Sequence, residues 1–325
     1  MHTRLAVLIA VAGILTMPPA QAAEPVNVVT PSRVMFSIPF WIAERNGYFR
    51  DENIAATLEI VPNGREITQR LLSRTAQFSI VGPDDVMIDA SKGGPLRIVA
   101  GVVRKPPLFL IAKPSIKTFA DLRGANIGVL SLTEGSSKLL ARMAKAEGLA
   151  PADLKITAVG GAPARWTLLK DGKIDAGMQP LPLNLEAEAA GFSNLGWAGT
   201  YEPDWQFTTI NANGDWARAN PKLATGFLRA LVRAQAFIWS NPDEAAQIAA
   251  DALKTPVALT ARSLQEASRL GILDPKLDWS EIGLQRIYEG QQADGAIPKD
   301  RAFDLGMVTA ADYLRGAQSS LATTR

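Results

Sequence analysis

Short apolar segments of strand length alternate with segments of helical length along residues 26–112. The first three segments of strand length in this stretch are residues 26–30, 58–61 and 78–81. The segment between the first two of them ends at Asn46-Gly47, a common helix stop. Strands that alternate with helices are typical of a parallel sheet covered by helices on both faces. The spacing therefore predicts a doubly wound α/β fold.

The same alternation restarts after Lys105-Pro106-Pro107, which separates two further β-rich segments. Strands are then predicted at residues 127–130, 155–159 and 175–178. In a chain of 325 residues, a restarted pattern indicates two α/β lobes rather than one. We expect crossing strands to join a first lobe, residues 23–112 plus 212–325, to a second lobe, residues 113–211.

From Asp215 onward the sequence predicts helices. Asn220-Pro221 and Asn241-Pro242 each supply an N-cap residue followed by a proline at the first helical position. Between these pairs, one face of a predicted helix carries Leu223, Phe227, Leu231, Ala234 and Ile238. This spacing favours packing against a protein core.

The N-terminus has the composition of a secretory signal peptide. Arg4 precedes an apolar run over residues 5–17, and small residues around Ala20 and Ala22 follow. We predict a signal peptide at residues 1–22, cleavage after Ala22, and a soluble protein exported to the periplasm.

Cysteine is absent, and the only histidine is His2, inside the predicted signal peptide. The exported chain therefore lacks the side chains for Ser-His-Asp and Cys-His catalysis and for the usual zinc sites, and a lipid-modified cysteine is excluded. Without histidine, affinity for a sulfonate or another ligand that does not itself titrate there is expected to be nearly flat from about pH 6 to 8. A net charge of +2 gives no sign of a nucleic-acid partner.

Residues 39–54, PFWIAERNGYFRDENI, resemble the first helix and following turn of the nitrate, sulfonate, taurine and thiamine-precursor binding proteins. Residues 119–124 (FADLRG) and 170–176 (KDGKIDA) are similar to the same family. The resemblance implies a type II periplasmic binding protein without a cofactor. Its implied partners are a small molecule and an ABC permease with a cytoplasmic ATPase, and its implied state is a monomer.

Two departures from this family affect the expected activity in different ways. Residues 73–78 read SRTAQF where relatives commonly carry Gly and Asp before the third strand. The family's sequence pattern is weaker here, but the same fold is expected. A fungal branch makes a pyrimidine precursor with His and Cys side chains that this chain lacks. An enzyme of that kind is therefore not expected.

Ligand contacts are expected in the cleft, where strand ends and helix N-termini of the two lobes meet. The candidates from the first lobe are Phe36, Ser37, Asn63, Arg65, Pro83 and Asp84. Arg65 can hold a carboxylate or sulfonate through two parallel donors, although an arginine at a helix start is often a solvated surface residue. Asp84 can accept a ligand N–H or O–H, whereas a catalytic pair with Asp85 is disfavoured because adjacent side chains point apart.

The candidates from the second lobe are Thr133, Ser136, Arg165 and Gln179. Thr133 and Ser136 precede or begin a predicted helix, where they can bind an anion or simply cap the helix. Arg165 follows a Gly160-Gly161 junction and is a second candidate clamp for an anionic group.

These features predict reversible capture of a small polar or anionic organic compound, such as a sulfonate or carboxylate, for import. One alternative is a thiamine or pyrimidine precursor as the ligand. Others are a periplasmic enzyme acting through Asp, Glu, Ser or a bound metal, and a binding protein that reports to a sensory receptor.

Overall fold

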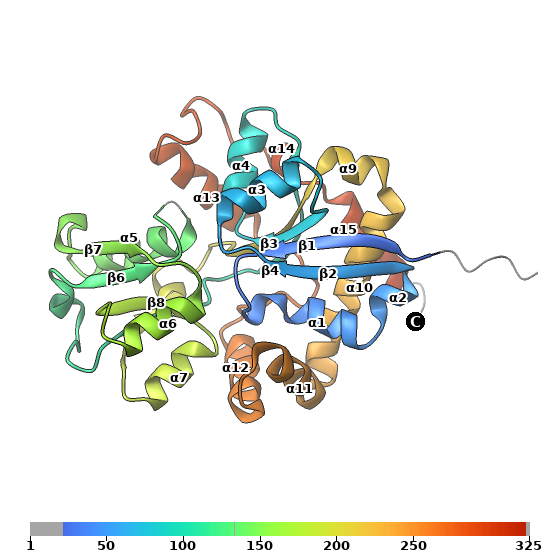
Figure 1. The fold of residues 1–325 in the computed structure, drawn as a ribbon. Helices are drawn as coiled ribbons and strands as arrows, with labels where there is room; N and C mark the ends of the chain where they lie inside the picture. The colour runs from blue at the N-terminus through green and yellow to red at the C-terminus, as the bar shows by residue number, and fades with distance from the viewer. Residues whose placement is uncertain (1–21, 133, 323–325) are drawn as a thin grey trace, which may run out of the picture.

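The computed structural model describes residues 22–132 and 134–322, which form two α/β lobes side by side (Figure 1). Almost all of the predicted signal peptide lies outside the described residues, as does Thr133. Within the described part, none of the helices has the length and apolar character needed to span a bilayer.

The sheet of the first lobe has the strand order β2-β1-β3-β10-β4. Its strands are β1 (Glu24–Thr30), β2 (Ile54–Ile60), β3 (Phe78–Val81), β4 (Leu96–Val103) and β10 (Thr208–Asn213). β1 is parallel to β2 and β3, whereas β10 is antiparallel to β3 and β4, so the sheet is mixed. Its early helices are η1 (Met35–Ser37), α1 (Ile38–Arg45), α2 (Tyr48–Asp51), α3 (Gly64–Leu72) and α4 (Asp84–Ser91).

The sheet of the second lobe has the order β7-β6-β8-β5-β9. Its strands are β5 (Leu108–Ala112), β6 (Asn126–Val129), β7 (Lys155–Ala158), β8 (Ala176–Pro180) and β9 (Ser193–Trp197). Its helices are η2 (Phe119–Leu122), α5 (Gly135–Ala146), η3 (Pro151–Asp153), α6 (Ala162–Lys170), α7 (Leu183–Ala189) and α8 (Ala198–Tyr201). Again β6 is parallel to its neighbours β7 and β8, and β5 is antiparallel to β8 and β9.

The chain passes between the two sheets at residues 104–107 and 202–207. β5 pairs within the second sheet and β10 within the first, so the sheet membership of β5 and of most of β10 differs from the lobe boundaries expected at 112/113 and 211/212. β5 is apolar and buried along its whole length, a pattern that suits a central strand of either sheet. Only its pairing with distant strands decides between them.

The C-terminal part is helical and packs mainly on the first lobe (Figure 1). Its helices are α9 (Gly214–Ala219), α10 (Pro221–Ser240), α11 (Pro242–Leu253), α12 (Val257–Arg269), α13 (Glu281–Ala293), α14 (Leu305–Val308) and α15 (Asp312–Ala322). The predicted core face of α10 is confirmed, because Phe227 is fully buried and stacks on Phe78 with ring centroids 4.1 Å apart. The prolines begin α10 and α11 as predicted, but neither Asn220 nor Asn241 caps its helix through the side chain.

Candidate functional site

A cavity of about 820 Å³ lies between the lobes and is lined by residues of both. The first lobe contributes the carboxyl ends of β1 and β3 and the N-termini of α3 and α4. From the second lobe come the residues after β6 and the N-termini of α5 and α6. Loops at the carboxyl ends of strands, facing helix N-termini across a cleft, are the usual place for a ligand in α/β folds.

Most of the residues singled out from the sequence line this cavity. Those that do are Phe36, Asn63, Arg65, Asp84, Ser136 and Arg165. Three others lie nearby without lining it, because Ser37, Pro83 and Gln179 are buried in the structure that supports the cavity. Thr133 is outside the described residues.

Several lining residues were not among the sequence-based candidates. They include Thr30, Ser32, Thr68, Ser79, Asp85, Glu134, Phe207 and Thr208. Thr30 is the last residue of β1, a position that faces the cleft in parallel sheets and that could have signalled it. Phe207 lies on the crossing between the lobes and packs edge-on against Phe36, with ring centroids 5.6 Å apart. Nothing in the local sequence marks that residue.

Four helix N-termini point at the cavity, and three of them already carry an acceptor from the chain itself. Asn63 accepts from the backbone N–H of Arg65 in α3 at 3.0 Å, and the Glu134 carboxylate accepts from the backbone N–H of Ser136 in α5 at 3.0 Å. Acidic residues occupy the first turn of α4. In contrast, α6 has no side-chain cap. Among the four, α6 is therefore the N-terminus most open to an anionic group.

Arg165 stands in the first turns of α6 and is only 3% exposed. Its Nε and Nη2 donate to the Met178 carbonyl at 3.1 and 2.7 Å, and its Nη1 donates to the Gly160 carbonyl at 2.7 Å. No described residue forms an ion pair with it. Burial lowers the pKa of Arg165 to about 10, against the opposing charge of Glu134, so the group stays cationic at neutral pH. The cavity wall thus contains a buried positive charge without an anionic partner in contact.

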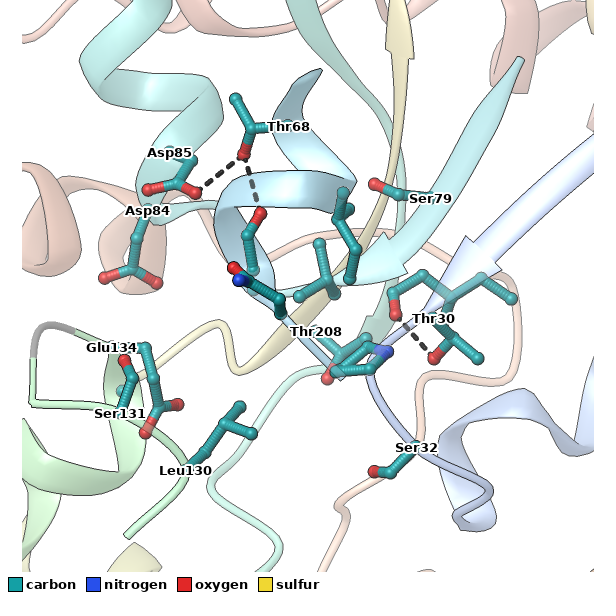
Figure 2. A pocket seen from close by; sticks show the side chains of 18 of the residues that line it. Thr30, Ser32, Thr68, Ser79, Asp84, Asp85, Leu130, Ser131, Glu134 and Thr208 are labelled. Carbon is teal, nitrogen blue, oxygen red and sulfur yellow. Dashed lines mark hydrogen bonds between the residues drawn. The ribbon is translucent and has the colours of Figure 1, made fainter. Parts of the chain in front are cut away.

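Asp84 provides a negative charge on the first-lobe wall of the cavity. Figure 2 shows Asp84 and Asp85 at the start of α4, with Glu134 and Ser131 of the second lobe below them. The Asp84 carboxylate accepts from Gln291 Nε2 at 2.6 Å and lies 3.7 Å from Lys138 Nζ. Burial raises the pKa of Asp84 to about 6, and the charges of Glu134 and Asp85 add to this while Lys138 opposes it.

The remaining acidic groups accept hydrogen bonds from the helices around the cavity. Asp85 accepts from Thr68 Oγ1 at 2.7 Å (Figure 2). Burial raises the pKa of Glu134, although hydrogen bonds from Ser136 and the backbone of Ser131 oppose that effect. The described residues contain no group of His, Cys, Asp and Glu suited to hold a metal ion. The cavity therefore offers an acceptor side around Asp84 and a cationic side around Arg165.

Two curated relatives resemble the chain in sequence. A Brucella abortus protein, whose name gives it an unconfirmed binding role, is 25% identical over 237 residues, which are 70% of this chain and 73% of the relative. A Legionella pneumophila protein named 4-amino-5-hydroxymethyl-2-methylpyrimidine phosphate synthase is 23% identical over 266 residues, or 76% of this chain and 81% of the relative.

Solved structures resemble the chain more completely. The periplasmic nitrate-binding protein NrtA from Synechocystis superposes with a TM-score of 0.74 at 15% identity, covering 92% of this chain and 89% of that one. The alkanesulfonate-binding protein SsuA from Xanthomonas axonopodis, bound to MOPS, gives 0.69 at 16% identity, covering 89% and 99%. At these identities the likeness concerns the fold, and it confirms the predicted periplasmic-binding-protein architecture. Residues 36–245, more than half of the chain, match the NMT1/THI5 like family, to which the chain belongs.

Proposed function

We propose that this protein is the periplasmic substrate-binding component of an ABC importer. It acts as a monomer, captures a small polar or anionic organic compound between its lobes, and delivers it to a permease with a cytoplasmic ATPase. The fold shared with NrtA and SsuA supports a binding role. Hinged closure around a ligand is the common behaviour of such two-lobed proteins.

The observation that carries the proposal is the buried, unpaired charge of Arg165 at the uncapped N-terminus of α6. A buried cation is costly unless it is paired, and a helix N-terminus attracts anions. Three of the five guanidinium N–H groups donate to backbone carbonyls, which leaves two for another acceptor. We therefore assign the anionic group of the ligand, a carboxylate or sulfonate, to this side of the cavity.

The opposite side is proposed to receive a hydrogen-bond donor of the ligand at Asp84. The other proposed contacts are Phe36, Asn63, Arg65 and Ser136. An aminopyrimidine is the second candidate ligand, because its exocyclic amine suits the Asp84 carboxylate and because the Legionella relative is named for pyrimidine chemistry. We propose binding rather than turnover, since the sequence has no cysteine and its single histidine is His2.

A thermal-shift screen tests the proposal with methanesulfonate, propanesulfonate, short carboxylates, their neutral amides and 4-aminopyrimidine. A compound at about one hundred times its Kd stabilises the folded form by about 2.7 kcal/mol. We expect anions to bind better than their amides, and Arg165→Met to weaken an anion by at least about tenfold, or 1.4 kcal/mol.

Arg45→Met is the matched control, because it removes an exposed arginine that does not line the cavity. Arg165→Lys, which keeps the charge, covers the case in which Arg165→Met does not fold. Equal binding of anions and amides contradicts the assignment of the anionic group. Mass spectrometry of the recovered compound distinguishes binding from turnover.

A further inference from the structure

Lys138 lies on α5 of the second lobe and points out of that lobe. Its ammonium nitrogen is 3.0 Å from Asp294 Oδ2 and 3.7 Å from Asp84 Oδ1. The Lys138 and Asp84 side chains are each only 13% exposed. This nitrogen is shielded from solvent, although neither contact has hydrogen-bond geometry. A lysine rarely occupies such a place unless its charge is paired.

Both acidic partners of Lys138 belong to the first lobe. Asp84 begins α4, and Asp294 directly follows α13. α13 packs against α4, and Gln291 near its end donates to the same Asp84 oxygen that faces Lys138. The three charged side chains therefore form an ion-pair cluster between the lobes, which we call the interlobe triad (Asp84, Lys138 and Asp294).

A second set of ion pairs links the second lobe to α13, one helical turn further along α5. Arg142 pairs with Glu202 of the second lobe at 2.5 Å, and Arg286 of α13 lies 3.8 Å from the same carboxylate. Glu202 thus joins α5 to α13, as a second link beside the triad. α13 is held to the second lobe at two places by charge.

The members of the triad differ in their relation to the cavity. Asp84 lines it, whereas Lys138 and Asp294 do not. If Lys138 is neutralised, the Asp84 carboxylate keeps the charge of Glu134 of the other lobe nearby without the opposing lysine, and like charges oppose the approach of the lobes.

We propose that the interlobe triad holds the two lobes in the closed arrangement, with Lys138 as the residue that positions Asp84 at the edge of the cavity. Asp84 belongs both to the cavity wall and to the interlobe contact. A ligand that binds Asp84 therefore affects the closure of the two lobes. That consequence rests on the proposed function, whereas closure itself can be measured without any ligand.

The experiment is a distance measurement between spin labels on the two lobes in the ligand-free protein. Because the sequence has no cysteine, Glu44→Cys on α1 and Lys173→Cys after α6 give two unique, exposed labelling positions. In this background, Lys138→Met is expected to lower the ratio of closed to open protein by at least about tenfold. Asp294→Asn, with a half-exposed carboxylate, is expected to lower it by about threefold.

Lys145→Met on the exposed side of α5 and Asp300→Asn in the loop after α13 are matched controls that leave the ratio unchanged. Lys138→Arg keeps the charge and should retain most of the closed form. Asp294→Asn keeps the test valid if Lys138→Met does not fold. Distance distributions identical to the parent protein in both Lys138→Met and Asp294→Asn overturn the proposal. That result leaves ligand binding by the cavity untouched, and absence of binding in the thermal-shift screen leaves the distance result untouched.

Discussion

Asp84→Asn is expected to change how the stability of the protein depends on pH. Burial raises the pKa of the Asp84 carboxyl from 3.8 to about 6. The folded protein therefore keeps a proton on Asp84 at pH values where the unfolded chain has released it. This group contributes fully to stability below pH 3.8, and the contribution is lost as the pH rises through about 6.

The size of the effect follows from the pKa values. A change from 3.8 to about 6 corresponds to about 3 kcal/mol, at about 1.4 kcal/mol per pKa unit. Roughly 2 kcal/mol of this falls between about pH 4.5 and pH 8. Asparagine has a similar shape and no charge at any pH. The free energy of unfolding of Asp84→Asn should therefore rise, relative to the parent protein, by about 2 kcal/mol over that interval.

Urea unfolding followed by circular dichroism at several pH values measures this difference. The attraction of Lys138 acts on the ionised carboxylate, so it is already included in the pKa of about 6. Asp300→Asn serves as a control, because it makes the same substitution at an exposed position that does not line the cavity. If the difference between Asp84→Asn and the parent protein is the same at every pH, the reasoning on burial of Asp84 is refuted.

Three further predictions concern the core, a helix cap and the N-terminus. Phe227→Ala should lower the free energy of unfolding by about 3–5 kcal/mol, because the side chain is fully buried between the rings of Phe49 and Phe78; urea unfolding measures it. Asn213→Ala should cost about 1 kcal/mol in the same assay, since its side chain accepts from the first backbone N–H groups of α9. Mass spectrometry of exported protein should find an N-terminus at Ala23, and a retained Met1 contradicts the predicted cleavage.

The fold could be predicted to a large extent because the alternation of strands and helices is a local property. Membership of β5 and β10 in their sheets could not, since it depends on pairing between residues far apart in the chain. The two arginine candidates illustrate the same limit. Arg65 and Arg165 each follow a glycine-containing junction at a helix start, yet Arg65 is exposed and Arg165 is buried. Only the packing of the lobes distinguishes them.

The expectation of pH-independent binding shows where reasoning from residue types stops. Because the only histidine is His2, no side chain after that residue has an ordinary pKa near neutrality. The structure buries Asp84 among other carboxylates and raises its pKa to about 6, which brings its titration to the lower edge of the range expected to be flat. The sequence contains the residue, but its surroundings come from three separate elements, α4, α5 and α13.

The chain leaves the first sheet and re-enters it at two neighbouring points, so the second lobe can be exchanged as a unit. Thr208, where the chain re-enters the first sheet, lies opposite Val103, where it left, and the Phe207 N–H donates to the Val103 carbonyl at 2.9 Å. All five strands of the second sheet come from the intervening residues, so this lobe is a continuous insertion with adjacent ends. Recombination between related genes at these two points can therefore join the first lobe of one protein to the second lobe of another. The new cavity then has one wall from each parent, and the strand register within both sheets is kept.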